Sequence, residues 1–248
     1  MNTKEYYSVL IDNISSDLTV SELYHGVAWT AARLSNGAYG VAMHCEGDSR
    51  PRMFPSLIGM PVKLAAEAIR SWNLEEADEA MAAVNAYYNT AEHTALYQAE
   101  PSAQENGTLF GVDLSDKIVG FVGHLVNHKG SITEEMLSVC RQYYILEREP
   151  KPGDYPDSAA EFLLPACDIV VITGSAAMNK TIPRVLELSK HAEIYLTGPS
   201  VTLCPELRCF GIRRLHGSYI TDGERMIPSI MEKRSHLHPY SRRFMLDL

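Results

Sequence analysis

The stretch Asp168–Thr181, DIVVITGSAAMNKT, sets the class of fold to which the rest of the chain conforms. Its apolar and β-branched run, Ile169–Thr173, predicts a strand that is buried on both faces. Gly174 and Ser175 end that run, and a helical pattern begins at Thr181. A strand, a small-residue turn and a helix in this order predict a parallel sheet whose carboxyl edge carries the turn, where α/β sheets bind ligands.

The second half of the chain repeats this alternation. Four further strands are predicted from apolar and β-branched runs, at residues 118–122, 142–146, 193–197 and 212–215. Helical patterns are predicted at residues 132–140, 161–164, 181–191 and 224–232. Strands that alternate with helices form parallel sheets with right-handed crossovers, so this half is predicted to be a Rossmann-like α/β domain.

The first half predicts a smaller α+β unit. An opening helix over residues 4–14 precedes an antiparallel meander of two or three strands over 20–44, in which Asn36-Gly37 predicts a two-residue hairpin turn. Helical periodicity returns over residues 62–72, where the apolar stripe that is expected to be buried consists of Leu64, Ala65, Ala68, Ile69 and Trp72.

A third helix of this half is predicted to begin after Asn73 and to run to about Tyr88, with Glu76 completing a capping-box-like pair. The polar segment 101–107 is the best candidate for a linker. We therefore predict two domains, at residues 1–105 and 106–248.

Composition narrows the functional class. Among 248 residues, 46% are hydrophobic and 21% charged, which is ordinary for a globular protein, and the net charge of -9 argues against generic nucleic-acid binding. No apolar run approaches the ~20 residues that span a bilayer, and the first residues lack the pattern of a signal peptide, so a cytoplasmic location is expected. The five scattered cysteines fit buried free thiols better than a zinc or disulfide framework.

Each predicted strand of the second half ends in small or polar residues. These strand ends are Gly123-His124, Glu147-Arg148, Thr173-Gly174-Ser175, Thr197-Gly198-Pro199-Ser200 and His216-Gly217-Ser218. Parallel strands bring such ends to one rim, where glycines allow a close approach to a ligand and helix N-termini attract anions. The alternative is that these residues serve the connections alone.

The rim offers candidate metal ligands in His124, Glu147 and His216, although a structural, hydrogen-bonded role is the commoner one for any single histidine. No HExxH or CxxC spacing supports them. His44 and Cys45 are adjacent, and adjacent strand residues face opposite sides, which argues against joint ligation.

Other chemistries have thinner support. Ser175 and Ser200 lie at strand-to-helix turns, but without a GxSxG elbow. The chain lacks a GxGxxG turn, although Glu147 occupies the position at which an acidic residue binds a ribose. Lys180 could neutralise an anion or be a solvated lysine. The basic residues of the tail fit a solvated terminus better than an anion site; they are Lys233, Arg234, Arg242 and Arg243, near His236 and His238.

Three motifs of the second half, GDYPDSAAEFLLPACDIVVITGSAAMNKT, LTGPSVTLCPELRCFGI and HGSYITDGE, resemble those of the prokaryotic family named for putative heavy-metal chelation. The upstream stretch SLIGMPVKLAAEAIRSWNLEEADEAMAAVNAYYN resembles that family's first-domain signature. The resemblance implies an enolase N-terminal-like domain followed by a Rossmann-like domain, with a site between them. The segment LVNHKGSITEE, after His124, departs from the family's pattern.

Mapped onto this chain, the site that the resemblance implies contains Gly123, His124, Thr173, Gly174, Ser175, Asn179, Lys180, Thr181, Gly198, Pro199, Ser200 and Asn85. The leading hypothesis is a protein that binds a small anionic or metal-chelating ligand there, with a divalent transition metal as the cofactor and His124, Glu147 and His216 facing it. The rival hypothesis is a Rossmann-type enzyme that uses a nucleotide or an S-adenosylmethionine-like cofactor. The expected partners include neither nucleic acid nor membrane; catalysis and a homodimer are left open.

Overall fold

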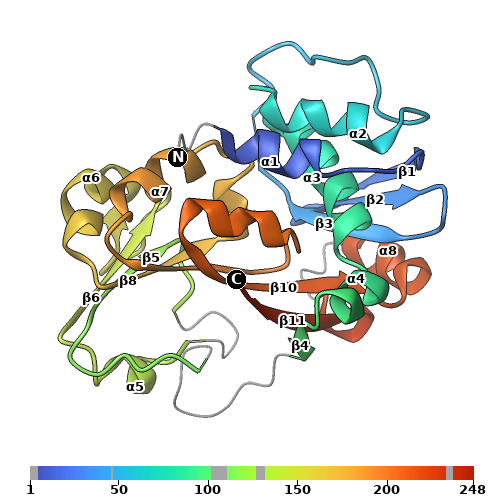
Figure 1. The fold of residues 1–248 in the computed structure, drawn as a ribbon. Helices are drawn as coiled ribbons and strands as arrows, with labels where there is room; N and C mark the ends of the chain where they lie inside the picture. The colour runs from blue at the N-terminus through green and yellow to red at the C-terminus, as the bar shows by residue number, and fades with distance from the viewer. Residues whose placement is uncertain (1–4, 46, 102–110, 127–131, 233–236) are drawn as a thin grey trace.

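The computed structural model of the chain describes residues 5–45, 47–101, 111–126, 132–232 and 237–248. It has a small antiparallel sheet and a larger, mostly parallel sheet, so the predicted α/β fold class is confirmed. Figure 1 shows the smaller sheet and α3 at one end of the larger sheet, beside β10 and β11. No helix in these five ranges is long and apolar enough to cross a membrane.

The first unit is a three-stranded sheet in the order β1-β2-β3 with helices against it. Its elements are α1 (Tyr6–Asp12), β1 (Val20–His25), β2 (Trp29–Leu34), β3 (Tyr39–Met43), α2 (Val62–Ala65), η2 (Ala66–Arg70), α3 (Leu74–Tyr88) and α4 (Ala91–Leu96). The meander is therefore confirmed. Its Asn36-Gly37 turn is a three-residue loop in which Gly37 takes φ +86° and its N–H donates to the carbonyl of Leu34.

The second unit is an eight-stranded sheet in the order β4-β11-β10-β9-β8-β5-β6-β7. Its strands are β4 (Glu100–Pro101), β5 (Ile118–Val122), β6 (Gln142–Glu147), β7 (Tyr155–Pro156), β8 (Ile169–Thr173), β9 (Glu193–Thr197), β10 (Ile212–Ile220) and β11 (Ser241–Asp247). Its helices are α5 (Glu134–Leu137), η3 (Asp157–Ala159), α6 (Ala160–Leu163), η4 (Leu164–Ala166), η5 (Gly174–Ala176), α7 (Ile182–Leu188), η6 (Pro205–Phe210), α8 (Gly223–Met231) and η7 (His238–Tyr240).

Strands β5 to β10 run parallel to one another. Strand β11 pairs antiparallel with β10, and β4 pairs antiparallel with β11. All five predicted strands are present, but the last is longer than predicted, because β10 pairs with β9 on one side and with β11 on the other. The predicted helix over residues 62–72 is a single α-helical turn followed by a 3-10 turn. Trp72, expected on its buried stripe, is 67% exposed.

The start of α3 has one of the two hydrogen bonds of the predicted capping box. The Asn73 side chain accepts a hydrogen bond from the Glu76 amide at 3.0 Å, as expected for an N-cap. The buried Glu76 carboxylate instead accepts from the amides of Met53 and Phe54, both at 2.8 Å. Glu76 therefore anchors the preceding loop to the helix.

One apolar core runs through both units. Leu10 and Met81 of the first unit belong to the same buried cluster as Met178 and Leu203 of the second. In addition, α8, from the end of the chain, covers one face of the first unit's sheet, with Ile230 packed in the same cluster as its residues. The division at residue 105 stays a prediction, but packing joins the two units closely.

Candidate functional site

The register of the larger sheet brings the predicted strand ends to one level. Thr173 pairs with Thr197, and Thr197 pairs with His216. Counted along the chain from β5 to β10, the strand order is 3-2-1-4-5-6, the order of doubly wound nucleotide-binding sheets, in which ligands bind where the direction of winding reverses. Here that reversal lies between β5 and β8.

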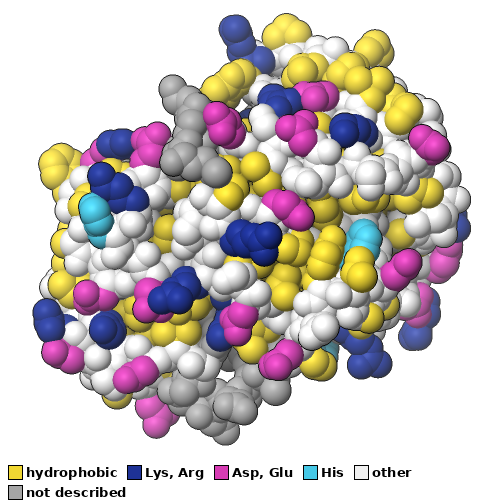
Figure 2. Space-filling model, in the orientation of Figure 1, with side chains coloured by type: hydrophobic (Ala, Val, Ile, Leu, Met, Phe, Trp, Pro, Cys, Tyr) yellow, Lys and Arg dark blue, Asp and Glu magenta, His cyan; other side chains and the backbone are white. Residues whose placement is uncertain are grey.

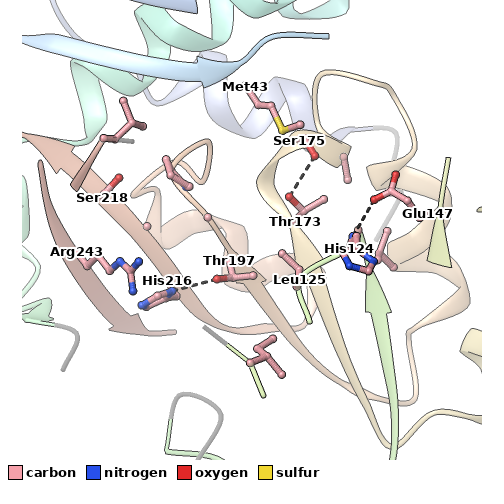
Figure 3. A pocket seen from close by; sticks show the side chains of 18 of the residues that line it. Met43, His124, Leu125, Glu147, Thr173, Ser175, Thr197, His216, Ser218 and Arg243 are labelled. Carbon is pink, nitrogen blue, oxygen red and sulfur yellow. Dashed lines mark hydrogen bonds between the residues drawn. The ribbon is translucent and has the colours of Figure 1, made fainter. Parts of the chain in front are cut away.

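A pocket follows this rim and is closed on one side by the first unit. Eleven predicted site residues line it: Gly123, His124, Glu147, Thr173, Ser175, Asn179, Lys180, Thr181, Gly198, Pro199 and His216. The first unit contributes Met43, His44 and Cys45 at the end of β3. Figure 3 shows Met43 above Ser175 and Thr173, with His124 and Glu147 on one side of them and His216 on the other.

Three predicted site residues lie behind the wall of the pocket. Asn85 donates to the carbonyls of Val41 (2.9 Å) and Ser200 (3.2 Å) and accepts from the Thr202 hydroxyl (2.7 Å). The Ser200 hydroxyl accepts from the Met43 amide at 2.9 Å. These residues join the first unit to the loop after β9.

The third of them, Gly174, allows a close backbone approach. A Cβ on Gly174 would lie 2.7 Å from the backbone of Ser200 and Val201. The glycine is therefore required by packing against the loop after β9, as Asn85 and Ser200 are required by hydrogen bonding.

His124 is held by a buried carboxylate that the strand pattern did not indicate. Its Nδ1 lies 2.9 Å from Oδ2 of Asp154, whose side chain is 3% exposed. The same oxygen accepts from the Lys151 amide at 3.0 Å, so the carboxylate is fixed. With Nδ1 engaged, Nε2 is the ring nitrogen left for a ligand, because the described residues give it no hydrogen-bond partner.

Glu147 shapes the turn in which His124 lies. One carboxylate oxygen accepts from the His124 amide and the other from the Arg148 amide, both at 2.8 Å. Gly123 takes φ +104°, and a Cβ there would lie 2.8 Å from Cγ2 of Thr173, so only glycine fits between β5 and β8. The contribution of Glu147 is to position the backbone of His124.

His216 is a buried, neutral imidazole. Its Nδ1 lies 3.1 Å from the Thr197 hydroxyl. Burial lowers the pKa of His216 to about 4, and the positive charges of Arg243 and Arg214 act in the same direction. Within the described part of the chain, no group of three or more His, Cys, Asp or Glu side chains is placed to hold a metal ion, so His124, Glu147 and His216 are not assembled there into one ligand set.

A buried polar cluster lies where the first unit meets the pocket. Oδ2 of the fully buried Asp78 accepts from the Cys45 amide at 2.6 Å and lies 3.3 Å from Nδ1 of His44. Burial raises the pKa of Asp78 to about 8 and that of Cys45 to about 12. The expectation that His44 and Cys45 face opposite sides is wrong, because β3 ends at Met43 and strand alternation ends with it.

Lys180 is part of this buried region rather than a solvated lysine. Its ammonium group contacts the carbonyl of Ile69 and lies 5.4 Å from the centre of the Tyr7 ring. Burial lowers the pKa of Lys180 to about 8, while nearby Asp78 and Cys45 raise it. Its backbone is left-handed, with φ +68°, a conformation that costs free energy in a non-glycine residue.

The basic tail also differs from the expectation. Arg242 and Arg243 belong to β11, and both line the pocket, as does His238. The segment 241–247 was missed as a strand, although buried Phe244 and Leu246 alternate with less buried residues. Lys233, Arg234 and His236, the linker residues 102–107 and residues 127–131 of the atypical LVNHKGSITEE segment lie outside the described residues.

The fold is that of an α/β protein with a pocket along the rim of its larger sheet, and a small α+β unit covers one side of this pocket. Two family models match, DUF4213 over residues 7–88 and DUF364 over residues 109–245, both described as putative heavy-metal chelation. The second match covers more than half of the chain, which therefore belongs to the putative heavy-metal chelation family. The resemblance in the motifs is confirmed.

Solved structures and curated proteins agree with this membership. A DUF364-family protein of unknown function from Desulfitobacterium hafniense matches with a TM-score of 0.86 and 32% identity, over 100% of this chain and 98% of that one. Another, from Pyrococcus horikoshii, has a TM-score of 0.81 at 20% identity over 100% of both chains, and supports the fold alone. An uncharacterised protein of Methanocaldococcus jannaschii is 30% identical over 118 residues, which span 45% of this chain and 44% of that protein.

Proposed function

We propose that the protein binds a small oxyanionic metal complex in the pocket between the first unit and the rim of the larger sheet. The observation that carries the proposal is the contact of His124 Nδ1 with the buried Asp154 carboxylate. Histidines that bind metals commonly donate the other ring N–H to a carboxylate, which fixes the tautomer and leaves a basic nitrogen for the metal. Metal binding agrees with the description of the family at its own level.

The remaining groups of the wall suit an oxygen-rich ligand. The hydroxyls of Thr173 and Ser175 lie 3.2 Å apart beside His124 in the close view (Figure 3). Arg148 and Lys180 line the same pocket and add positive charge to its surroundings. One imidazole together with hydroxyls and cations favours a metal that arrives already coordinated by a chelator.

Calorimetry tests the proposal with Ni(II), Co(II), Zn(II) and Fe(III), each added as the free ion and as its citrate complex. We expect binding tighter than ~100 μM for at least one citrate complex, and at least about tenfold weaker binding by His124→Ala. His191, which is exposed and outside the pocket wall, supplies the matched control His191→Ala. Equal affinity in both variants, or no binding by the wild type, would refute the proposal.

The strand order favours one other function, that of an enzyme using a nucleotide or S-adenosylmethionine-like cofactor. Glu147 lies at the end of the second strand, where dinucleotide-binding proteins place a ribose ligand. A thermal-shift screen separates the two functions, since NAD, ATP or S-adenosylmethionine would raise the melting temperature of the enzyme, and metal complexes that of the binding protein.

We also propose that the protein is cytoplasmic. This location is supported by the five cysteines, all of which are unpaired in the structure, as is usual in a reducing compartment.

A further inference from the structure

Ser218 places a buried hydroxyl without a partner in the wall of the pocket. The residue is 6% exposed, and its Oγ has no hydrogen-bond partner among the described residues. Its backbone, by contrast, is engaged, since the carbonyl of Ser218 accepts from the Asn89 side chain at 3.1 Å. A buried hydroxyl that is left unpaired destabilises the protein, so a ligand that supplies a hydrogen-bond partner from the pocket would relieve that cost.

Arg243 lies directly across from this hydroxyl. Ser218 and Arg243 are register partners in the antiparallel β10–β11 pair, so their side chains lie on the same face of the sheet. No described carboxylate forms an ion pair with Arg243, whose guanidinium lies beside the His216 ring in Figure 3. A guanidinium and a hydroxyl on one face together provide the donors that carboxylates and phosphates prefer.

The surroundings keep this pair positive. His216 lies on the same face, two residues before Ser218, and its contact with Thr197 directs the ring. Burial and the neighbouring arginines hold the pKa of His216 low, which is the response of an imidazole next to cations. Donors and cations therefore predominate around the pair, although Glu100 of β4, opposite Met245, places one carboxylate on the same face without forming an ion pair with Arg243 in the described structure.

The group is also separate from His124. β10 lies three inter-strand steps from β5, which is about 14 Å at the usual spacing of strands. One molecule reaches both places only if it is elongated.

We propose that Ser218 and Arg243 form an oxyanion subsite that holds a terminal carboxylate of an elongated polycarboxylate chelator, whose metal lies at the His124 end of the pocket. The inference rests on the proposed function and adds the chemical class of the chelator. It also assigns the subsite to β10 and β11, away from the edge where β5 and β8 separate.

Calorimetry with metal-free citrate as the probe, repeated with Ni(II)–citrate and with inorganic phosphate, tests the subsite. We expect Arg243→Gln to weaken citrate binding at least about tenfold and Ser218→Ala severalfold, while His124→Ala leaves metal-free citrate unaffected. Arg213→Gln is the matched control for the lost positive charge. Arg213 lies on β10, as Ser218 does, but outside the pocket wall, so this variant should bind citrate as the wild type does. Ser218→Ala should melt at the wild-type temperature or above it, because no protein contact of the hydroxyl is lost.

The outcomes separate the two proposals. Citrate binding that depends on Arg243, without any gain from nickel, would support the subsite and overturn the metal proposal. Citrate is too short to reach both places at once, so metal-free citrate binding that does not depend on Arg243 or Ser218 would overturn the subsite alone. Phosphate binding more tightly than citrate would overturn the carboxylate assignment, and no binding of any probe would overturn both.

Discussion

The rim of the larger sheet has two regions that differ in the hydrogen bonding of their polar groups. Behind the pocket, Asn85 of α3 and Asn89, the C-cap of that helix, bind the loop after β9 and the backbone of β10, and we call this region the seam. Asn89 donates to the carbonyls of Val201 (2.8 Å) and Ser218 (3.1 Å) and accepts from the Leu203 amide (2.7 Å). In the pocket wall, His124 Nε2 and Ser218 Oγ have no partner among the described residues.

The difference shows that lying at a strand end does not by itself make a residue a ligand-binding residue. Buried polar groups must be paired, so those at the seam are paired within the protein and stabilise the joint between the units. Polar groups in the wall are held in position but keep unused hydrogen-bonding or ligating atoms, which a ligand can engage. On the face shown in Figure 2, acidic and basic side chains are interspersed.

The largest expected effect is on the seam. Asn85→Ala would leave the carbonyls of Val41 and Ser200 and the Thr202 hydroxyl without this partner, and we expect a loss of about 3 kcal/mol in the free energy of unfolding. Urea denaturation measures it. Asn13→Ala, which removes one exposed contact to the Val9 carbonyl, should cost under about 0.5 kcal/mol. Equal costs would remove the contrast between seam and surface.

Next comes Asp78, which lies between the two regions. Its pKa in the folded protein, about 8, lies above the ordinary value of 3.8, so the folded state holds the proton more tightly and stability falls as the pH rises from about 4 to about 8. Asp78→Asn should therefore stabilise the protein by about 2 kcal/mol at pH 8 and by much less at pH 5. Thermal melts of both proteins across that range test the sign. The exposed Asp116→Asn is the control, and a gain independent of pH would contradict the assignment.

A smaller effect is expected on binding at the wall. Asp154→Asn keeps an oxygen that can accept from both the Lys151 amide and Nδ1–H of His124, but it removes the carboxylate charge that makes Nε2 a more basic metal ligand. We expect about tenfold weaker binding of a citrate-bound metal with little change in unfolding free energy. Calorimetry beside urea denaturation separates the two, and a loss of stability equal to the loss of affinity would assign Asp154 to the fold instead.

The smallest effect compares two serines of similar predicted role. Ser200→Ala removes the acceptor of the Met43 amide and should cost about 1 kcal/mol. Ser175→Ala, in the wall, should cost under about 0.5 kcal/mol, because its hydroxyl meets only that of Thr173. Denaturation midpoints measured in parallel decide the order, and the reverse order would contradict the distinction between seam and wall.

Sequence patterns predicted the strands and the level of their ends, because runs such as Ile169–Thr173 are local and unambiguous. They could not distinguish Asn85 from a ligand-binding asparagine, since the same amide serves a carbonyl of the protein or of a ligand. Asp154 lies seven residues after Glu147 in a loop, and only the fold brings it to His124. Arg243 was obscured by the basic residues around it, although Phe244 and Leu246 carried a period of two.

The packing of α8 against the first unit's sheet determines whether the two halves of the chain can be separated. A Cβ on Gly223 would lie 2.1 Å from the ring of Tyr39, so the last helix is fitted closely to a strand formed near the start of the chain. Expressed by itself, residues 106–248 would expose α8 and the apolar side of β10 to water. We therefore expect the two halves to unfold in one cooperative transition. We also expect the pocket to bind its ligand without a hinge movement of one half against the other.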